Sequence, residues 1–277
     1  MEDTNPYLVC ASLDFFVRIR TVFENTPQIN INRYLPSNSQ INRITSINNT
    51  TVGMCFNNSF IIKDFKSSSH QVFQGHYGNV MDLAASDGKY YTCGEDKSWM
   101  VWDSRLKTPQ TTIPTSHALS CLGLHHSKDY LIIGNEDGQI SLWNTNEFKI
   151  VNSIQLSQDP VRSIATSTIN NKIVALTQDG RGFALAINNG MLQIVKTFEV
   201  HHDVPLRCVI SLDETMFITT SADSTAKLWD FESYEYIQTL VEPDQKKWVW
   251  DAAFTNDSRY VCTAGTDATI RTWDIEN

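Results

Sequence analysis

The sequence lacks the closely spaced cysteines that a zinc site needs. Its six cysteines stand at 10, 55, 93, 121, 208 and 262, and no two of them form a C-x-x-C pair. Most of them lie inside apolar runs, such as Tyr91-Thr92-Cys93. We therefore expect buried thiols in a reducing compartment, and neither a metal site nor a cofactor.

The chain also lacks a long apolar run and a secretory signal. No stretch approaches the roughly 18 apolar residues of a membrane span, and the start, MEDTNPYLVC, has no basic region and no apolar core. The absences predict a cytoplasmic chain without direct membrane insertion. Because glycosylation belongs to secreted proteins, the sequons are expected to stay unmodified; they begin at Asn48, Asn49, Asn57 and Asn256.

Basic residues are in the minority. Lysine and arginine number 22 against 31 aspartates and glutamates, which gives a net charge of -9 and a pI near 5.2. A chain this acidic repels phosphate backbones, so we expect no nucleic-acid partner. Its composition, 41% apolar and 19% charged, is that of a folded globular protein. No useful window keeps apolar residues at helical spacing, which favours an all-β fold.

What the sequence does have is a repeat. Four segments place an aspartate six residues before a tryptophan: Asp96 and Trp102, Asp137 and Trp143, Asp223 and Trp229, and Asp267 and Trp273. The same register finds three degenerate copies, with Arg20, Lys63 and Leu185 at the tryptophan position. The seven positions, 20, 63, 102, 143, 185, 229 and 273, follow one another at close to the spacing of a WD repeat, which the pattern resembles.

The repeats predict a single seven-bladed WD-repeat β-propeller over residues 1–277. Its blades are expected at residues 7–36, 37–74, 75–114, 115–157, 158–199, 200–243 and 244–277. Short runs rich in β-branched and aromatic residues, each followed by a turn, predict strands. These runs are Lys89–Cys93, Tyr130–Ile133, Lys172–Leu176, Met216–Thr220 and Arg259–Thr263.

The two ends of the chain depart from a complete ring. Only six residues precede the apolar run at Tyr7, and the chain stops just after Trp273-Asp274. We therefore expect the first blade to lack its innermost strand and the last blade its outermost, leaving about 26 strands. The joint between them is then incompletely closed and held by side-chain packing alone. A truncated sequence is the alternative.

A set of polar residues recurs with the repeat. Its members are His76, Thr92, Asp96 and Trp102; His117, Asp137 and Trp143; His201, Thr219, Asp223 and Trp229; and Thr263, Asp267 and Trp273, with Gln245 in place of the histidine. Histidine, aspartate and a hydroxyl can suggest a catalytic triad. A nucleophilic site should occur once, however, and in WD repeats these side chains form a hydrogen-bonded chain inside each blade. We therefore predict a structural network, no catalytic residue and no enzyme.

Four segments resemble, in order and spacing, the small WD-repeat subunit of target-of-rapamycin (TOR) kinase complexes, the G-protein β-subunit-like protein. They are Ser39–Ile44, Gly75–Val80, Ser221–Trp229 and Trp248–Phe254. The resemblance implies a non-catalytic scaffold that binds and stabilises the TOR kinase domain, beside other subunits of the complex, and supports growth signalling. It also implies a cytoplasmic location, with peripheral contact to endomembranes through the complex left open.

The same resemblance places Trp248 and Trp250 on the face that meets the kinase. Trp248 falls where a loop enters an innermost strand, and Trp250, two residues on, is expected to point to the same side. The alternative is that one or both wedge between blades. Equivalent rim positions carry charges of mixed sign, which suits a protein surface better than a phosphate: Arg43, Asp82, Gly123, Ser163, Arg207 and Asp251. The predicted partner-binding residues are Trp248, Trp250, Asp251, Arg207 and Arg43.

Other functions of WD-repeat chains make different demands on the sequence. A generic WD-repeat adaptor of another multiprotein assembly is the serious alternative, because residues 105–200 match the family only in their repeat frame. A heterotrimeric G-protein β-subunit would carry an N-terminal coiled coil, and a ubiquitin-ligase receptor would carry an adaptor-binding domain. Neither segment is expected in this sequence, which argues against both functions. A propeller enzyme needs metal ligands or carboxylates that converge at the channel mouth. The rim residues provide no such cluster, so no small-molecule substrate is expected.

Overall fold

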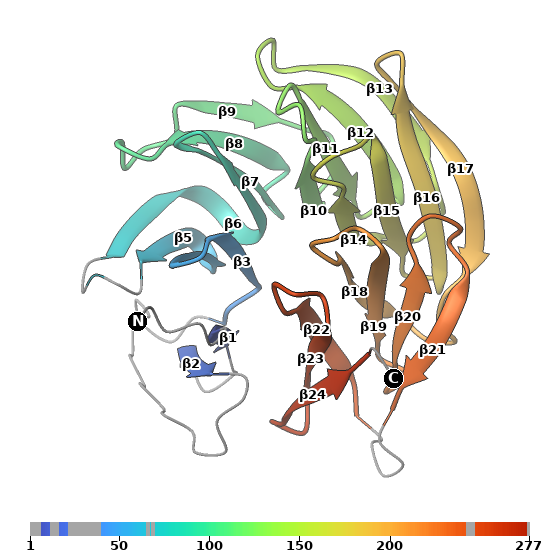
Figure 1. Ribbon diagram of the computed structural model, residues 1–277. Helices are drawn as coiled ribbons and strands as arrows, with labels where there is room; N and C mark the ends of the chain where they lie inside the picture. The colour runs from blue at the N-terminus through green and yellow to red at the C-terminus, as the bar shows by residue number, and fades with distance from the viewer. Residues whose placement is uncertain are drawn as a thin grey trace. The chain divides into compact units, whose positions relative to one another are not determined.

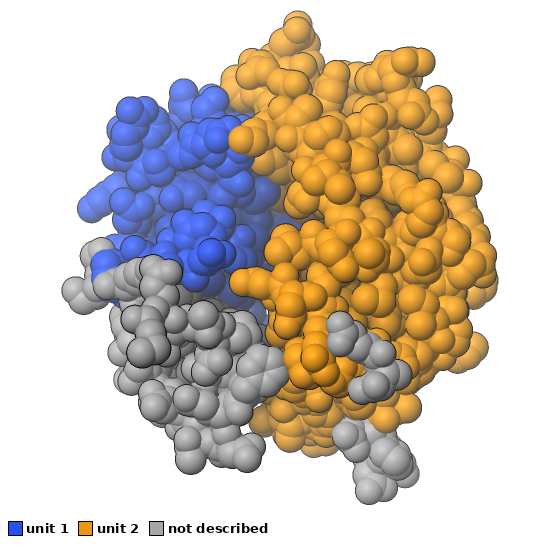
Figure 2. Space-filling view, in the orientation of Figure 1, with its two compact units in different colours: residues 1–114 blue, residues 115–277 orange. Residues whose placement is uncertain are grey.

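The computed structural model describes residues 40–64, 67, 70–241 and 247–275 in full, and residues 7–11 and 17–21 as backbone strands. The chain divides into two compact units, residues 1–114 and 115–277, coloured blue and orange in Figure 2. All the regular secondary structure in the described part consists of β-strands, so the predicted all-β class is confirmed. None of the described residues form a helix suited to crossing a membrane.

The first unit holds a hairpin and a larger antiparallel sheet (Figure 1). Its strands are β1 (Tyr7–Ala11), β2 (Val17–Thr21), β3 (Arg43–Asn48), β4 (Thr51–Cys55), β5 (Asn57–Asp64), β6 (His70–Ser86), β7 (Lys89–Gly94), β8 (Ser98–Asp103) and β9 (Thr111–Pro114). β1 pairs with β2, and the other seven follow one another in chain order. The long strand β6 pairs with β5 through its first half and with β7 through its second half, so it joins two four-stranded repeats.

The second unit holds three four-stranded sheets and one of three strands, all in chain order. The strands are β10 (Leu119–Leu124), β11 (Tyr130–Asn135), β12 (Gln139–Asn144), β13 (Lys149–Gln155), β14 (Val161–Thr166), β15 (Lys172–Thr177), β16 (Arg181–Asn188), β17 (Met191–Glu199), β18 (Pro205–Ile210), β19 (Met216–Ser221), β20 (Ala226–Asp230), β21 (Tyr236–Leu240), β22 (Val249–Phe254), β23 (Tyr260–Gly265) and β24 (Ile270–Asp274). The strands predicted from the sequence fall on β7, β11, β15, β19 and β23, and only the last begins one residue later than predicted.

One pairing register is common to all these repeats. The residue at the tryptophan position always lies opposite the second residue of the preceding strand, as Trp102 lies opposite Tyr90. The degenerate residues Arg20, Lys63 and Leu185 take the same place in their own repeats. The register therefore survives loss of the indole, because turn geometry and the apolar pattern of the strands fix it.

In the second unit the apolar core lies between successive sheets. Ile173 and Ala175 of β15 pack with side chains of the β10–β13 sheet. Val174 and Leu176 of the same strand pack with side chains of the β18–β21 sheet. Alternate residues of a strand face opposite sides, so one central strand stabilises two interfaces. This is the stacking of four-stranded units that the repeat predicts.

The ends of the chain are described only in part. The β22–β24 sheet has three strands among the described residues, and the first repeat is represented by the β1–β2 hairpin. The side chains of residues 7–36 lie outside the described part. The expected joint between first and last blades involves those residues and stays a prediction.

Candidate partner-binding face

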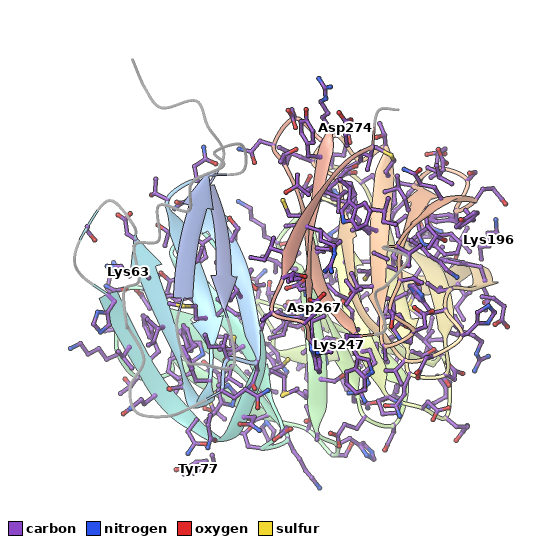
Figure 3. The ribbon with its side chains drawn as sticks, turned by 90° about the horizontal axis from the view of Figure 1, so that it is seen from below. Lys63, Tyr77, Lys196, Lys247, Asp267 and Asp274 are labelled. Atoms are coloured by element: carbon purple, nitrogen blue, oxygen red, sulfur yellow. The ribbon has the colours of Figure 1, made fainter. Side chains whose placement is uncertain are left out.

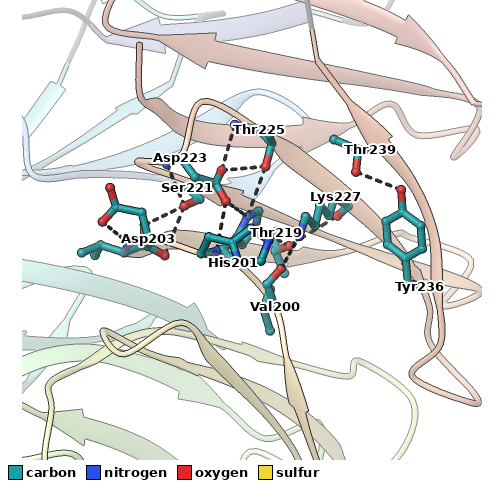
Figure 4. A network of polar contacts seen from close by, with 12 residues as sticks. Val200, His201, Asp203, Thr219, Ser221, Asp223, Thr225, Lys227, Tyr236 and Thr239 are labelled. Carbon is teal, nitrogen blue, oxygen red and sulfur yellow. Dashed lines mark hydrogen bonds and ion pairs between the residues drawn. The ribbon is translucent and has the colours of Figure 1, made fainter. Parts of the chain in front are cut away.

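In the sixth repeat the predicted polar residues form one hydrogen-bonded chain, of which Figure 4 shows His201, Thr219 and Asp223. His201 Nδ1 lies 2.9 Å from Asp223 Oδ2, and His201 Nε2 lies 2.9 Å from Thr219 Oγ1. Trp229 Nε1 donates to the same threonine oxygen at 3.0 Å. A neutral His201 satisfies both contacts, by donating from Nδ1 and accepting at Nε2. Thr219 is wholly buried, so its hydroxyl links two side chains and cannot reach a substrate.

The third repeat builds the same chain. His76 lies 2.9 Å from Asp96 and 2.8 Å from Thr92, to which Trp102 Nε1 donates at 2.8 Å. Burial lowers the pKa of His76 by more than the charge of Asp96 raises it. Burial alone would raise the pKa of Asp96, but the Tyr77 N–H and the His76 ring outweigh it, and that pKa is lowered. The fold therefore favours a neutral histidine beside an ionised aspartate.

The fourth repeat separates residues that the sequence grouped together. His117 and Asp137 pair at the surface, with side chains 47% and 56% exposed. Trp143 Nε1 donates to Ser141 at 2.9 Å. Ile133 takes the fourth place of its strand, which threonine takes in the third and sixth repeats, so no hydroxyl there can link the histidine to the indole.

The seventh repeat keeps one link of the chain. Trp273 Nε1 donates to Thr263 Oγ1 at 2.9 Å. Asp267 instead pairs with Arg271, at 2.6 Å. Gln245, which stands at the histidine position, lies outside the described residues. The polar set therefore varies between repeats while the strand register does not.

Trp248 and Trp250 form an exposed aromatic pair at the start of β22. Each is 46% exposed, and their ring centroids lie 5.2 Å apart with an interplanar angle of 61°. The Trp248 carbonyl accepts a hydrogen bond from the Thr266 N–H at 3.0 Å, and the Trp250 carbonyl accepts one from Thr220 Oγ1 at 3.4 Å. The backbone is thus fixed by two repeats while both rings remain open to solvent.

A β-bulge sets the direction of Trp250. The pairing of β22 with β23 joins Val249 to Gly265 and Asp251 to Ala264, so Trp250 is the extra residue. Bulges redirect a side chain and break the alternation of a strand. The two rings are in contact, as predicted. The cause is the bulge at Trp250 and not the regular strand alternation on which the prediction relied. Inner strands of other repeats carry the same bulge, at Met81, Ser120, Arg162 and Leu206.

Most of the other predicted rim residues face neighbouring strands. Arg43 donates two hydrogen bonds to Asp82, at 3.0 and 2.9 Å, and the two side chains are only 10% and 4% exposed. Arg207 Nε lies 3.4 Å from Asp251 Oδ1, and only the aspartate, 45% exposed, reaches far into solvent. Ser163 is wholly buried. The alternating charges are therefore ion pairs between adjacent repeats, and Arg43 offers a partner little surface.

Gly123 does not belong to this set, and its assignment as a rim position is wrong. Cys121, paired with Gly134, takes the place in the fourth repeat that Asp82 takes in the third. The first hairpin turn covers residues 87–88 in the third repeat but residues 125–129 in the fourth. A rim position counted back from the tryptophan of the fourth repeat with the spacing of the third repeat therefore falls two residues too far along β10.

Metal-ligating side chains and thiols are spread over the described part of the chain. There, no three His, Cys, Asp or Glu side chains gather in a way that could hold a metal ion. The cysteines at 55, 93, 121, 208 and 262 are buried, as predicted. Cys10 has no described side chain.

Sequence comparison identifies relatives of two kinds. The WD domain, G-beta repeat family matches residues 67–103, 107–144, 192–230 and 234–274, more than half of the chain. The mouse target of rapamycin complex subunit LST8 is 28% identical over 166 residues, which cover 56% of this chain and 50% of that protein. The Arabidopsis thaliana non-functional target of rapamycin complex subunit LST8-2 is 24% identical over 278 residues, covering 92% and 85%. The match thus spans about half the length of the mouse relative.

Structural comparison agrees on the architecture. The WD40 β-propeller domain of Doa1 superposes with a TM-score of 0.83, over 99% of this chain and 90% of that one, at 15% sequence identity. At this identity the likeness bears on the fold alone. The chain is therefore a WD-repeat β-propeller that belongs to the WD domain, G-beta repeat family and resembles the LST8 subunits of TOR complexes.

Proposed function

We propose that the chain is a non-catalytic scaffold subunit, which binds and stabilises the TOR kinase domain within TOR complexes and so supports growth signalling. The mouse relative is named as a subunit of such a complex. The segment Trp248–Phe254 resembles the same family at the site where this chain exposes two indoles. The scaffold acts in the cytoplasm, together with the other subunits.

The observation that carries the proposal is the open pair Trp248 and Trp250. A tryptophan can bury about 150–250 Å² on binding and is a frequent anchor of interfaces. The two rings contact each other edge to face, and the carbonyls behind them are hydrogen-bonded. A partner therefore meets a surface that is already ordered, which keeps the entropy cost of binding low. Asp251 adds a carboxylate for a cationic group of the partner.

Stabilisation of the kinase follows from the same rigidity. A ligand shifts a conformational equilibrium only as far as it prefers one conformation. β22 pairs with β23, and its carbonyl at Trp250 is tied to Thr220 of the preceding sheet. A fixed face of this kind binds one arrangement of a kinase domain and selects against others. The hydroxyls that imitate a triad, at Thr92 and Thr219, are buried and serve the blades.

Recovery of TOR kinase with the tagged chain tests the proposal. Trp248→Ala combined with Trp250→Ala should lower recovery roughly tenfold or more, the loss typical of central interface anchors. The matched control is Tyr77→Ala, because Tyr77 is 93% exposed in β6, just before the part of that strand that pairs with β7 (Figure 3). Circular dichroism should be unchanged in both variants, since the three side chains are exposed. Full recovery of the kinase with the double variant would overturn the assignment of this face.

The second candidate is a WD-repeat adaptor of another multiprotein assembly. It is favoured by residues 145–191, which lie outside the family matches, and by the partial coverage of the LST8 relatives. An adaptor would retain a set of partners without TOR kinase. Quantitative mass spectrometry of the proteins bound to the unsubstituted chain decides between the two functions.

A further inference from the structure

A second exposed apolar surface lies on the last strands of three successive sheets. Figure 1 shows these strands, β13, β17 and β21, along one side of the second unit. Six large apolar side chains on them are between 39% and 58% exposed: Ile150 and Val151, Ile194 and Val195, and Tyr236 and Ile237. We call these six residues the outer-strand band. Surface apolar residues are common singly, but a regular group of them is a mark of binding.

The band is built by one geometry used three times. In each repeat the first member of the pair lies opposite the tryptophan position, as Ile194 lies opposite Leu185. The second member falls in a register shift of the outer strand, as Val195 does between Ile194 and Lys196. The same shift occurs at Val151 and at Ile237. A bulge turns the second side chain outward, so neither member can sink into the core.

Apolar residues are not a requirement of the fold at these positions. In the second repeat His70 lies opposite the tryptophan position, Lys63, and is followed by Gln71. In the third repeat Pro109 and Gln110 take the places of Ile194 and Val195, because Thr111 pairs with Val101. Exposed apolar pairs at the repeats four to six therefore need an explanation other than packing.

Charge argues against a membrane or nucleic acid as the occupant. None of the six band residues is charged, and the nearby lysines are each paired with a glutamate: Lys149 with Glu147, Lys172 with Glu232 and Lys196 with Glu235. Figure 3 shows Lys196 at the edge of the second unit. Anionic lipid and phosphate backbones need unpaired basic groups. The complementary surface is therefore an uncharged apolar one.

An added β-strand does not fit the band well. The edge of β17 is occupied at Leu192, whose N–H donates to Asn152 Oδ1 at 3.1 Å while its carbonyl accepts from Asn152 Nδ2 at 3.4 Å. The bulge at Val195 further bends the edge. A helix suits the arrangement, because its backbone groups are hydrogen-bonded within the helix, so that it needs no free sheet edge.

We propose that the outer-strand band binds an amphipathic helix of a partner protein, whose uncharged apolar stripe lies across β13, β17 and β21. Binding of this kind uses side chains at i, i+3, i+4 and i+7 of the helix. The band does not involve Trp248 or Trp250, so it is independent of the kinase-binding proposal. A scaffold with both surfaces can hold two proteins at once.

Site-specific photocrosslinking tests the proposal in the full-length chain isolated with its bound partners. The photoreactive residue p-benzoylphenylalanine replaces Val195, and in a matched control it replaces Gln110, the corresponding position of the third repeat. We expect a crosslink from position 195 to one partner segment with an apolar stripe at helical spacing, and none from position 110. Ile150→Asp with Ile237→Asp should lower the yield at least roughly tenfold, since both ends of the stripe lose their contacts.

A synthetic peptide of the crosslinked segment should then bind the chain and gain helical circular dichroism on binding. The crosslink should persist when Trp248 and Trp250 are alanine, which separates this proposal from that for the kinase. Equal yields at positions 195 and 110, no crosslink at 195, a crosslink to a second copy of this chain, or a segment that binds without becoming helical would each overturn it. So would sedimentation with phosphatidylcholine and phosphatidylserine vesicles that depends on the band.

Discussion

Arg43 and Asp82 face each other from the first strands of two neighbouring repeats, joined by two hydrogen bonds of 3.0 and 2.9 Å. Arg207 and Asp251 occupy the same positions in the sixth and seventh repeats, but their closest atoms are 3.4 Å apart. The first pair is nearly buried, whereas Asp251 is open to water. One structural position thus yields a rigid ion pair in one unit and an available carboxylate in the other.

We predict unequal costs when either arginine is removed. Arg43→Met leaves the buried Asp82 charge without its bidentate partner and should lower the free energy of unfolding by about 3 kcal/mol. Arg207→Met should cost less than about 1 kcal/mol, because water can solvate Asp251. Urea denaturation of the two variants measures both values. Adding Asp82→Leu to Arg43→Met should restore part of the loss, and equal costs at the two sites would contradict this account.

The repeat register is the feature that the sequence predicts best. Lys63 and Leu185 stand where tryptophan stands elsewhere, yet both take the tryptophan's place in the strand pairing. Periodic spacing succeeds there because the alternation of apolar residues and the turns fix the pairing of strands. The side chain at the position matters less than its distance from the preceding turn.

Side-chain surroundings are harder to predict than register. The sequence shows that Arg43 and Asp82 have opposite charges, but only the structure shows that their strands are adjacent. A bulge adds one residue to a strand without changing the kind of residues in it. The local sequence therefore does not indicate that Trp250 and Val195 lie in bulges. The first turn is shorter in the third repeat than in the fourth, so the spacing of the third repeat points to Gly123 in place of Cys121.

Loss of the Thr219 hydroxyl should destabilise the chain more than loss of the Thr263 hydroxyl. Thr219→Val removes the partner of both His201 Nε2 and Trp229 Nε1, and we expect a loss of about 2 kcal/mol. Thr263→Val removes the partner of Trp273 alone, in a less buried site, and should cost about 1 kcal/mol. Thermal unfolding followed by tryptophan fluorescence compares the two variants. The hypothesis of a blade network fails if Thr219→Val is as stable as the unsubstituted chain.

Stability should fall as the pH drops below the ordinary range of histidine. Burial is the largest cause that lowers the pKa of His76 and also that of His125, to which the charge of His126 adds. The folded chain then binds fewer protons at these rings than the unfolded chain does. The stability they contribute is complete above the unfolded pKa, near 6.5, and is lost as the pH falls from there through the lower pKa of the folded state. The lowered pKa of Asp96 acts only at more acidic pH.

Melting temperatures measured between about pH 7.5 and 5 should therefore decline steadily, because the unfolded state takes up protons in this window. His125→Gln should reduce the slope of that decline, since it removes one of the two rings. His117→Gln is the matched control, because His117 lies at the surface. A slope that His125→Gln leaves unchanged would assign the pH dependence to other groups.

Two glycines with the same backbone conformation should respond differently to alanine. Gly138 has φ +76° and Gly190 has φ +74°, a left-handed region that costs an L-residue roughly 1–2 kcal/mol. A Cβ at Gly138 would lie well inside van der Waals contact with the backbone oxygens of Ser157 and Asp159. At Gly190 it would meet only the Tyr130 hydroxyl, at 3.6 Å.

Gly190→Ala should therefore cost the free energy of unfolding about 1 kcal/mol, from the left-handed backbone alone. Gly138→Ala must in addition displace the segment from Ser157 to Asp159, and its cost should reach about 3 kcal/mol or more. Chemical denaturation of both variants gives the difference. Because Leu156 N–H donates to the Gly138 carbonyl, the displacement should also speed amide exchange at Leu156 in the first variant and leave it unchanged in the second. Equal losses of unfolding free energy would mean that the loop before β14 moves at no cost and does not stabilise the turn at Gly138.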